Sequence, residues 1–490
     1  MKDGCKKLLI GVGSLLPLIG CNTAQAVNPD EFTVFPTPDY AWVGDPMPFY
    51  DEGSFEIFYL HDARSGSGGF HPWALMQTQN FYDYTDRGEV IPFVNDFDDQ
   101  ELALGTGSVI KVDGLYHAFY TAHNGSLNPK EAIMHATSTD KINWTKIPEN
   151  TFFASSQYNH NDFRDPYVFY NEQESRYWML ITTRKKNQGV IALYTSTDLK
   201  TWQDDGVLFE NDMGSDSNLE CPTLLQFGDY WYLSFSDQWP DRMVHYRIAT
   251  NPRGPFETPE RDVFDGAGFY AGRMEKSEDE LFVFGWVPTK VDYLDEKDFD
   301  WAGNLVIHQL IQQSDGTLNV QPISEMVNQI KAKQSLEYVT KSSGVKVSKN
   351  NYTFSESGYE SVIFPPMDEL NKIKGQIDMK DQSNLFGFTF NAVSGVGNLN
   401  IVFNTKENQL EFYNANIAQA SDSKPQSVLP LELSEGSIIN FTLVVEDTVA
   451  ALYVNDEIVL TTRMFSMPDS EWGLFSLDSN VEFKEVTLYQ

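Results

Sequence analysis

A short polar–aromatic motif returns along the first half of the chain, and this repeat restricts the fold more than any other feature. The motif has the form Ser/Thr-x-Asp/Asn-x-x-x-aromatic and ends at Tyr84, Trp144 and Trp202, which lie 60 and 58 residues apart. A looser copy ends at Phe256. Its polar residues favour a tight turn. A repeat of this period indicates a supersecondary unit that stacks on copies of itself.

Aromatic, strand-like segments run in step with this motif. They begin at Phe55, Leu115, Tyr177, Tyr230 and Leu281, in steps of 60, 62, 53 and 51 residues. Turn residues such as Asp113-Gly114 precede most of them, which is a hairpin signal. Units of four short strands predict an all-β fold whose first domain is a five-bladed β-propeller. The near-constant period argues against a single β-sandwich, and the two-residue hydrophobic period argues against a helical solenoid.

The repeat stops before the chain ends, and 490 residues suit more than one domain. We predict the propeller over residues 30–325, a linker helix over 326–337 and a β-sandwich over 338–490. In the sandwich, strands are expected at Leu385–Phe390, Leu399–Phe403, Leu410–Tyr413, Ile438–Val445, Ala450–Val454, Ile458–Thr462 and Val481–Tyr489, with a tight turn at Asn455-Asp456.

The N-terminus has the pattern of an export signal. Three lysines precede the apolar run Leu8 to Ile19, which is too short for a stable membrane span. Leu18-Ile19-Gly20-Cys21 resembles a bacterial lipobox, whereas Ala24-Gln25-Ala26 resembles an ordinary cleavage site. We favour the lipobox. It predicts a signal peptide over residues 1–20 and a lipid on Cys21, and therefore a lipoprotein at the outer membrane, cell surface or periplasm. Secretion is the alternative.

Charge and cysteine content restrict the partners. The formal net charge of −35 argues against binding to nucleic acid or to anionic membranes, so membrane contact is expected only through the lipid. We expect a monomer. Cys221 is the one cysteine outside the export segment, so neither a disulfide nor a zinc site is predicted in the folded body. We expect Cys221 to be a buried, inert thiol.

Three acids precede aromatic strands by similar distances. Asp45, Asp165 and Glu220 stand 10, 12 and 10 residues before the segments of the first, third and fourth units. We expect them in one register, converging at one mouth of the propeller channel. Clustered carboxylates repel one another, which costs stability. Such a cluster therefore indicates a function, either metal binding or acid–base chemistry. No Asp-x-Asp-x-Asp-Gly loop supports calcium, whereas glycoside cleavage needs such a pair of carboxyl groups.

Further residues near these acids are candidates for sugar contact. Arg164, next to Asp165, is expected to keep that carboxylate ionised. For Trp42 and Trp73, stacking on a sugar and packing at the rim are equally open. The candidates for substrate binding are Trp42, His71, Trp73, Thr106, Ser108, Arg164 and Tyr270.

From about Tyr40 to the C-terminus, the sequence resembles glycoside hydrolase family 32, the invertase, inulinase and levanase group. Its most specific motifs are similar to Arg164-Asp165-Pro166 and Glu220-Cys221-Pro222, with weaker matches at 105–108 and 269–271. The resemblance implies retaining hydrolysis of β-fructofuranosidic bonds in levan, inulin or sucrose, without a metal or cofactor. Asp45 would be the nucleophile, Glu220 the acid/base, and Asp165 would bind fructose hydroxyls and stabilise the transition state.

The first motif departs from the family pattern. The family usually reads Asn-Asp-Pro-Asn-Gly, and this chain reads Gly44-Asp45-Pro46-Met47-Pro48. The nucleophile is retained and the flanking asparagines are not, so we expect an altered specificity. Three other readings stay open: a fructosyltransferase with the same site, a five-bladed arabinosidase or xylosidase, and a non-catalytic fructan-binding lipoprotein.

Overall fold

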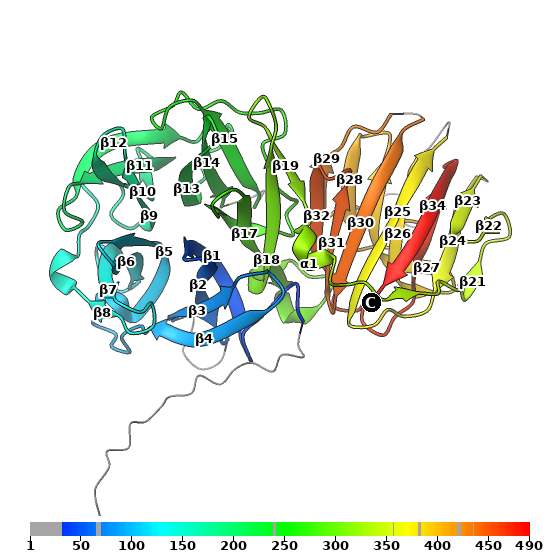
Figure 1. Ribbon diagram of the computed structural model, residues 1–490, viewed down its shortest axis with the longest axis horizontal. Coiled ribbons are helices and arrows are strands. Elements are labelled where there is room, and N and C mark those ends of the chain that lie inside the picture. The colour runs from blue at the N-terminus through cyan, green and yellow to red at the C-terminus, as the bar shows by residue number, and fades with distance from the viewer. Residues whose placement is uncertain are drawn as a thin grey trace, which may run out of the picture.

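The computed structural model describes residues 32–64, 70–238, 242–355, 357–380, 384–418, 423–434 and 436–490. The predicted signal peptide, the lipobox and Cys21 lie outside these residues. Two β-structured bodies lie side by side, a propeller built by β1 to β19 and a sandwich built by β20 to β34 (Figure 1). Within the described ranges, no helix is long and apolar enough to cross a membrane.

The propeller consists of five antiparallel blades. Blades one and two contain β1 (Trp42–Asp51), β2 (Ser54–Asp62), β3 (Trp73–Thr78) and β4 (Tyr84–Ile91), then β5 (Ala103–Val112), β6 (Leu115–His123), β7 (Glu131–Ser138) and β8 (Thr145–Lys146). Blade three contains β9 (Phe163–Asn171), β10 (Arg176–Lys185), β11 (Gln188–Ser196) and β12 (Gln203–Glu210). Blades four and five contain β13 (Leu219–Phe227), β14 (Tyr230–Asp237) and β15 (Val244–Ala249), then β16 (Tyr270–Lys276), β17 (Leu281–Lys290), β18 (Phe299–Gln312) and β19 (Leu318–Gln321). Short 3₁₀ helices lie at Gln100–Leu102, Pro148–Asn150 and Val291–Tyr293.

Both sequence series have a structural counterpart. The five aromatic segments are the second strands of the blades, and each strand starts within one residue of the predicted position. The polar motif is the turn between the third and fourth strands. In blade two, the Ser138 hydroxyl accepts from the backbone N–H groups of Asp140 and Lys141 at 3.1 and 2.9 Å. Ser196 accepts from Asp198 and Leu199 in the same way in blade three. The repeat is therefore real, and the predicted all-β propeller is confirmed.

Strand β18 closes the ring of blades. It pairs with β17 along most of its length, and Gly303, near its start, pairs with Val43 of β1. The last blade is thereby bonded to the first at the end of the channel where β1 begins. This contact brings residues 299–303 next to the Gly44-Asp45 motif.

The sandwich packs two antiparallel sheets face to face. One has the order β22-β23-β34-β25-β30-β31-β32, with β20 paired to β34, and the other β21-β24-β33-β26-β27-β28-β29. The seven predicted strands lie within β26 (Leu385–Val393), β27 (Val396–Asn404), β28 (Gln409–Tyr413), β30 (Ile438–Glu446), β31 (Val449–Val454), β32 (Ile458–Arg463) and β34 (Val481–Tyr489). The others are β20 (Lys333–Gln334), β21 (Thr340–Lys341), β22 (Lys346–Ser348), β23 (Asn351–Phe354), β24 (Tyr359–Phe364), β25 (Leu370–Met379), β29 (Ser427–Pro430) and β33 (Trp472–Leu477).

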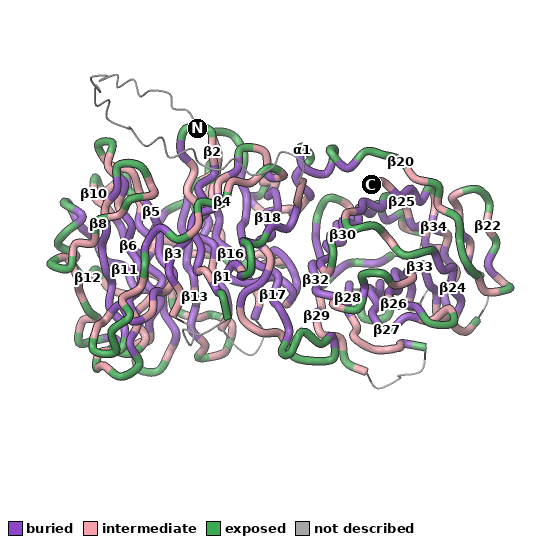
Figure 2. The backbone as a smooth tube through the Cα atoms, turned by 90° about the horizontal axis from the view of Figure 1, so that it is seen from below, coloured by how far each residue is buried: buried purple, intermediate pink, exposed green. Residues whose placement is uncertain are grey.

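The strand interiors of both bodies are buried (Figure 2). In the sandwich, Phe388, Phe441 and Phe483 meet between the two sheets, with ring centroids 5.1 and 6.1 Å from the Phe388 ring. The predicted turn at Asn455-Asp456 is confirmed, because both residues have positive φ and Glu457 N–H donates to Val454 O at 3.0 Å.

The linker helix predicted over residues 326–337 is wrong. The only helical turn there is α1 (Ser324–Val327), at the junction between the two bodies. Met326, Val327 and Ile330 are buried in the same cluster as the last propeller strands, and Lys333 then pairs with Tyr489 of β34. The segment is therefore extended because its apolar residues anchor it to the propeller and its next residues add a strand to the sandwich.

Arg463 of the sandwich reaches into the propeller. Its guanidinium donates to the carbonyl oxygens of Val287 and Pro288 at 3.1 and 3.2 Å and to Asn304 Oδ1 at 2.6 Å. The guanidinium also lies over the Trp42 ring, 5.6 Å from its centroid. Arg463 is 1% exposed, so these donors satisfy acceptors that water cannot reach.

Replacing Arg463 by alanine is therefore expected to lower the free energy of unfolding by about 3 kcal/mol, because it leaves buried carbonyl groups without a donor. Chemical denaturation followed by tryptophan fluorescence measures the change. The exposed Lys331→Ala provides a control that also removes one positive charge. Equal stability of the two variants would contradict a structural role for the buried guanidinium.

Candidate active site

Each innermost strand of the propeller contains a β-bulge at the same level. In β1, Asp45 and Pro46 lie between the pairs Gly44↔Leu60 and Met47↔Phe58, so that two residues oppose one. The equivalent residues of the other blades are Gly105-Thr106, Asp165-Pro166, Cys221-Pro222 and Ala271-Gly272. Bulges of this kind turn side chains away from the regular alternation of a strand.

The bulges correct the predicted register of the three acids. Asp45 and Asp165 both occupy the first bulge position, whereas Glu220 stands one residue earlier. The difference arises because Tyr230 and Phe55 do not occupy equivalent places in their strands. Tyr230 pairs with Phe227, the last strand residue before the hairpin turn, whereas Phe55 pairs with Tyr50, the residue before the last. We call the positions directly before the bulges the pre-bulge ring, which consists of Gly44, Leu104, Arg164, Glu220 and Tyr270.

The three acids nevertheless meet in one cavity of about 540 Å³ at the propeller channel. Both layers of residues, the bulges and the pre-bulge ring, contribute to its lining. The lining residues include Asp45, His71, Leu104, Thr106, Thr121, His123, Glu131, Arg164, Asp165, Glu220, Cys221, Gln238, Arg242, Tyr270, Phe299, Asp300 and Trp301.

Asp45 accepts two hydrogen bonds from neighbouring blades. The Thr106 hydroxyl donates to its Oδ2 at 2.7 Å, and the Trp286 indole N–H donates to its Oδ1 at 3.1 Å. Burial raises the pKa of Asp45 above its usual value, and these two hydrogen bonds oppose that rise. The charge of Glu220 raises the pKa of Asp45 further, so the two carboxyl groups act on each other.

Asp165 lies deeper, with 4% of its surface exposed. Its Oδ2 accepts from the Cys221 backbone N–H at 3.0 Å and from the Thr182 hydroxyl at 3.2 Å. Burial raises the pKa of Asp165, with Arg164 opposing the rise. The charge of Arg164 lowers the pKa of Asp165, which is the direction expected from the sequence, but desolvation by burial has the larger effect.

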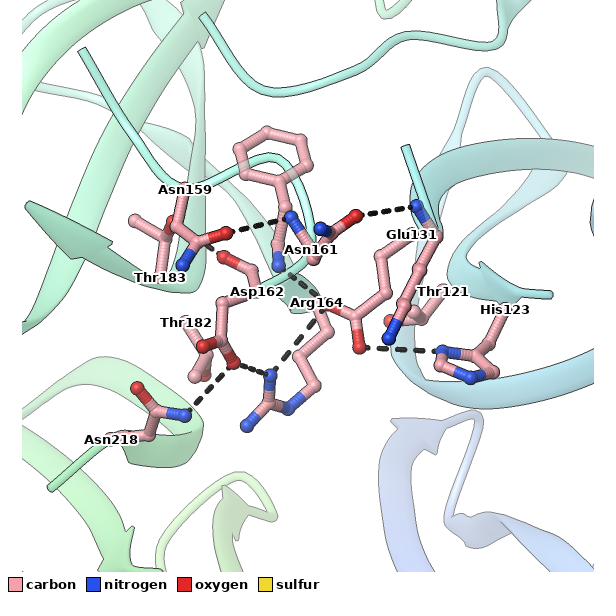
Figure 3. A network of polar contacts seen from close by, with 12 residues as sticks. Thr121, His123, Glu131, Asn159, Asn161, Asp162, Arg164, Thr182, Thr183 and Asn218 are labelled. Carbon is pink, nitrogen blue, oxygen red and sulfur yellow. Dashed lines mark hydrogen bonds and ion pairs between the residues drawn. The ribbon is translucent and has the colours of Figure 1, made fainter. Parts of the chain in front are cut away.

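Arg164 also forms an ion pair with Glu220. Its Nη2 lies 2.8 Å from Glu220 Oε1, and the Tyr270 hydroxyl donates to Glu220 Oε2 at 2.7 Å. Figure 3 shows Arg164 between Asp162, which it contacts, and Glu131, 3.6 Å away. Three consecutive members of the pre-bulge ring are thus joined by hydrogen bonds, and both oxygens of Glu220 are held.

The structure brings only some of the predicted sugar-contacting residues to the cavity. His71, Thr106, Arg164 and Tyr270 line it. The prediction is wrong for Trp73, which is fully buried and donates to Gly105 O at 2.9 Å, because the ring fills the core between blades one and two. Trp42 and Ser108 also lie outside the lining. Trp42 packs on Arg463, and the Ser108 hydroxyl accepts from Val168 N–H at 2.9 Å.

Two cavity features were missed from the sequence. Arg273 lies directly after the blade-five bulge. It donates to Pro222 O and Asp165 O at 3.2 and 3.3 Å, and so stabilises the bulges of blades four and three. The acid register, 10 to 12 residues before Leu281, falls on residues 269–271 and therefore does not reach Arg273. Trp301 has no motif of its own, and only the β18–β1 pairing places it here. Within the described residues, no group of three or more His, Cys, Asp or Glu side chains is arranged to hold a metal ion.

The family model for the N-terminal domain of glycosyl hydrolases family 32 matches residues 36–322, which include every blade of the propeller. The chain belongs to glycoside hydrolase family 32. It is 24% identical over 347 residues to a sucrose-6-phosphate hydrolase of Escherichia coli, covering 65% of this chain and 69% of that protein. It is 28% identical over 203 residues to a levanbiose-producing levanase of Bacillus subtilis, covering 39% and 36%.

Solved structures of the family share the whole architecture. The sucrose-6-phosphate hydrolase from Lactobacillus gasseri superposes with a TM-score of 0.70 at 18% identity, covering 94% of this chain and 92% of that one. Because the superposition extends over both domains, the propeller and the C-terminal sandwich belong to one conserved fold.

Cys221 should be unreactive in the folded protein. It is 3% exposed, and burial raises the pKa of its thiol well above the usual value. The thiolate needed for alkylation is therefore scarce even at pH 8. We expect iodoacetamide to leave Cys221 unmodified under native conditions and to modify it fully in denaturant, as measured by peptide mass spectrometry. Rapid native modification would show that the bulge of blade four opens to solvent.

Proposed function

We propose that this protein is a retaining glycoside hydrolase that cleaves β-fructofuranosidic bonds of fructans or of sucrose. The observation that carries the proposal is the meeting of Asp45, Asp165 and Glu220 in one cavity, each held by hydrogen bonds from a neighbouring blade. A retaining glycosidase needs two carboxyl groups, one as a nucleophile and one as an acid and then a base. The names of the relatives, which include a levanase, support fructosyl substrates.

In the first step, a carboxylate oxygen of Asp45 attacks the anomeric carbon of the fructosyl unit. Glu220 gives its proton to the glycosidic oxygen as the bond between that oxygen and the anomeric carbon breaks. The donors Thr106 and Trp286 hold the carboxylate of Asp45 in place before the attack. The product of this step is a fructosyl ester of Asp45 and a free leaving group.

In the second step, Glu220 is a carboxylate and takes a proton from a water molecule. The water oxygen bonds to the anomeric carbon, and the ester bond to Asp45 breaks. The ion pair with Arg164 and the hydrogen bond from Tyr270 stabilise Glu220 while it is charged. Asp165 contributes negative charge near the oxocarbenium-like transition state and an acceptor for fructose hydroxyls.

An uncharged sugar fits the cavity better than a phosphorylated one. The acids in its lining are Asp45, Glu131, Asp165, Glu220 and Asp300, and its arginines are Arg164 and Arg242. Arg164 is already paired with Glu220. A phosphate group would meet net negative charge, so we propose levan, inulin or sucrose as substrate rather than a sugar phosphate. We also propose that the protein is an exported lipoprotein modified at Cys21.

Product analysis tests the reaction class. Incubation with levan, inulin, sucrose, sucrose 6-phosphate and arabinan should release fructose or fructo-oligosaccharides from at least one of the unphosphorylated fructosides. With methanol as acceptor, a retaining enzyme forms the β-methyl fructofuranoside, which NMR identifies. Transfer to sugars without net hydrolysis would favour the transferase, and activity on arabinan alone would rule out the fructosidase.

Glu220→Gln should lower kcat by at least about a hundredfold, because general acid–base catalysis contributes that much or more. Asp45→Asn should be at least as damaging. The exposed Glu210→Gln, on the outer strand of blade three, is a matched control and should keep full activity. Circular dichroism checks that all three variants are folded. Wild-type turnover in Glu220→Gln would show that another group is the proton donor.

Thr106→Val should move the acid limb of the pH profile of kcat/KM to higher pH. The lost hydroxyl donates to Asp45 Oδ2 and lowers the pKa of Asp45, so its removal raises that pKa, and the nucleophile is then ionised only at higher pH. We also expect kcat/KM at its optimum to fall about tenfold.

Thr223→Val is the matched control for this substitution. Thr223 also lies on an innermost strand, directly after the blade-four bulge, and its buried hydroxyl has no hydrogen-bond partner in the described part of the chain. Its pH profile should equal that of the wild type. An identical acid limb in Thr106→Val and Thr223→Val would show that Thr106 does not tune Asp45.

A further inference from the structure

Arg164 is surrounded by more carboxyl groups than its single charge can balance. Its Nη2 lies 2.8 Å from Glu220 Oε1, whereas its Nη1 contacts Asp162 and lies 3.6 Å from Glu131 Oε2 (Figure 3). The charge of Asp165 also acts on the guanidinium. One positive charge therefore faces four acids, and the two ends of the guanidinium have different partners.

This arrangement matters because the proposed reaction needs Glu220 in two charge states. Glu220 must carry a proton when the glycosidic bond breaks and must be a carboxylate when water attacks. An ion pair with an arginine favours the charged form of a carboxyl group. If Arg164 had Glu220 as its sole partner, the ion pair would oppose the first step. A second carboxylate on the same guanidinium reduces this opposition, because Arg164 then keeps a partner while Glu220 is neutral.

Glu131 has the features of this second carboxylate. It comes from β7 of blade two and lines the cavity, with 7% of its surface exposed. Its Oε2 accepts from Phe163 N–H at 2.5 Å, and its Oε1 lies 3.5 Å from His123 Nδ1. Desolvation raises the pKa of Glu131, but His123, Arg164 and the Phe163 N–H together lower it below its usual value. Glu131 therefore stays charged beside Arg164.

Arg164 is bound tightly by Glu220 and loosely by Glu131. The distance of 2.8 Å to Glu220 is that of a charge-assisted hydrogen bond, whereas 3.6 Å to Glu131 is an ion pair without one. The gap leaves room for the guanidinium to move toward Glu131. Asp162 contacts the same end of Arg164 and is itself held by Asn218, whose amide donates to Asp162 Oδ1 at 3.0 Å.

We propose that Glu131 is a positioning residue, which balances the charge of Arg164 whenever Glu220 is protonated. This inference rests on the proposed function. In the first step, Glu220 gives its proton to the leaving oxygen, and Arg164 is balanced by Glu131 and Asp162 until the proton has left. In the second step, Glu220 is a carboxylate and Arg164 pairs with it again while water is activated. Glu131 exchanges no proton and acts only through Arg164.

Several other titratable or charged groups act on Glu220. They are Asp45 on β1, Cys221 beside it on β13, Arg242 before β15 and Tyr270 on β16. All of them stay in place when Glu131 is replaced. A change in the pH profile of such a variant therefore reports on the contacts of Arg164.

Glu131→Gln tests this role, because it removes the charge and keeps an acceptor for the Phe163 N–H. Arg164 should then hold Glu220 in its charged form more strongly. We expect the basic limb of the pH profile of kcat/KM to move to lower pH by about one unit. Asp162→Asn removes the other carboxylate at the same end of Arg164 and should move the limb in the same direction. Glu131→Asp should recover part of the change.

Two substrates separate proton donation from a merely structural effect. For sucrose or a fructan, whose leaving group needs a proton, Glu131→Gln should lower kcat/KM about tenfold at the wild-type optimum. For 4-nitrophenyl β-D-fructofuranoside, whose leaving group departs without a proton, the loss should stay below about twofold. The ratio kcat/KM is the suitable measure, because it reports the step in which the glycosidic bond breaks.

Glu174→Gln is the matched control, since Glu174 is also paired with an arginine, Arg253, at 2.6 Å, but outside the cavity lining. It should keep the wild-type pH profile. Thermal midpoints check that all variants are folded. An unchanged basic limb in both Glu131→Gln and Asp162→Asn, or equal losses of Glu131→Gln on the two substrates, would overturn the inference. A wild type inactive on every fructoside would instead refute the proposed function.

Discussion

In each of the five innermost strands, two residues oppose one on the neighbouring strand, at the same level of the channel. A regular strand would send adjacent side chains to opposite faces, so only one of two adjacent residues could point into the channel. The bulge removes this limit. Asp165 at a bulge and Arg164 directly before it both reach the cavity. Two layers of polar side chains can therefore face one sugar, and every contact described at the site depends on this arrangement.

In the pre-bulge ring, hydrogen bonds join side chains from different blades. Arg164, Glu220 and Tyr270 occupy equivalent positions on consecutive blades and are bonded in that order. Arg273 supports the same region from the next layer by donating to two bulge carbonyls. Because these partners come from separate blades, their spacing is set by blade packing and not by local loop conformation. Such an arrangement holds charged groups ready before substrate binds, which is what electrostatic catalysis requires.

The repeat was sufficient to predict the propeller, because the turn residues and the alternation of apolar and polar residues in the strands are local features that recur in each blade. It was not sufficient for the register of Glu220, because a bulge shifts the phase of a strand without leaving a sequence signal of its own. Trp73 was misjudged for a related reason: burial depends on which blade packs over a strand. The position of Trp301 in the cavity could not be predicted from the sequence, since it depends on one β18–β1 contact between residues about 260 positions apart. The four-residue α1 likewise followed from the packing of its neighbours and not from helical propensity.

Arg463 connects the sandwich to the wall of the cavity. Its guanidinium holds Asn304 of β18 and Val287 of β17, and Asn304 lies three residues after Trp301 on the same strand. The matched family segment ends at residue 322, yet a side chain 141 positions later supports the strand that presents the indole ring. The structural support of the cavity is thus larger than the propeller. Exchanging sandwich domains between relatives would remove a contact that holds β18 in place, although none of the residues that line the cavity belongs to the sandwich.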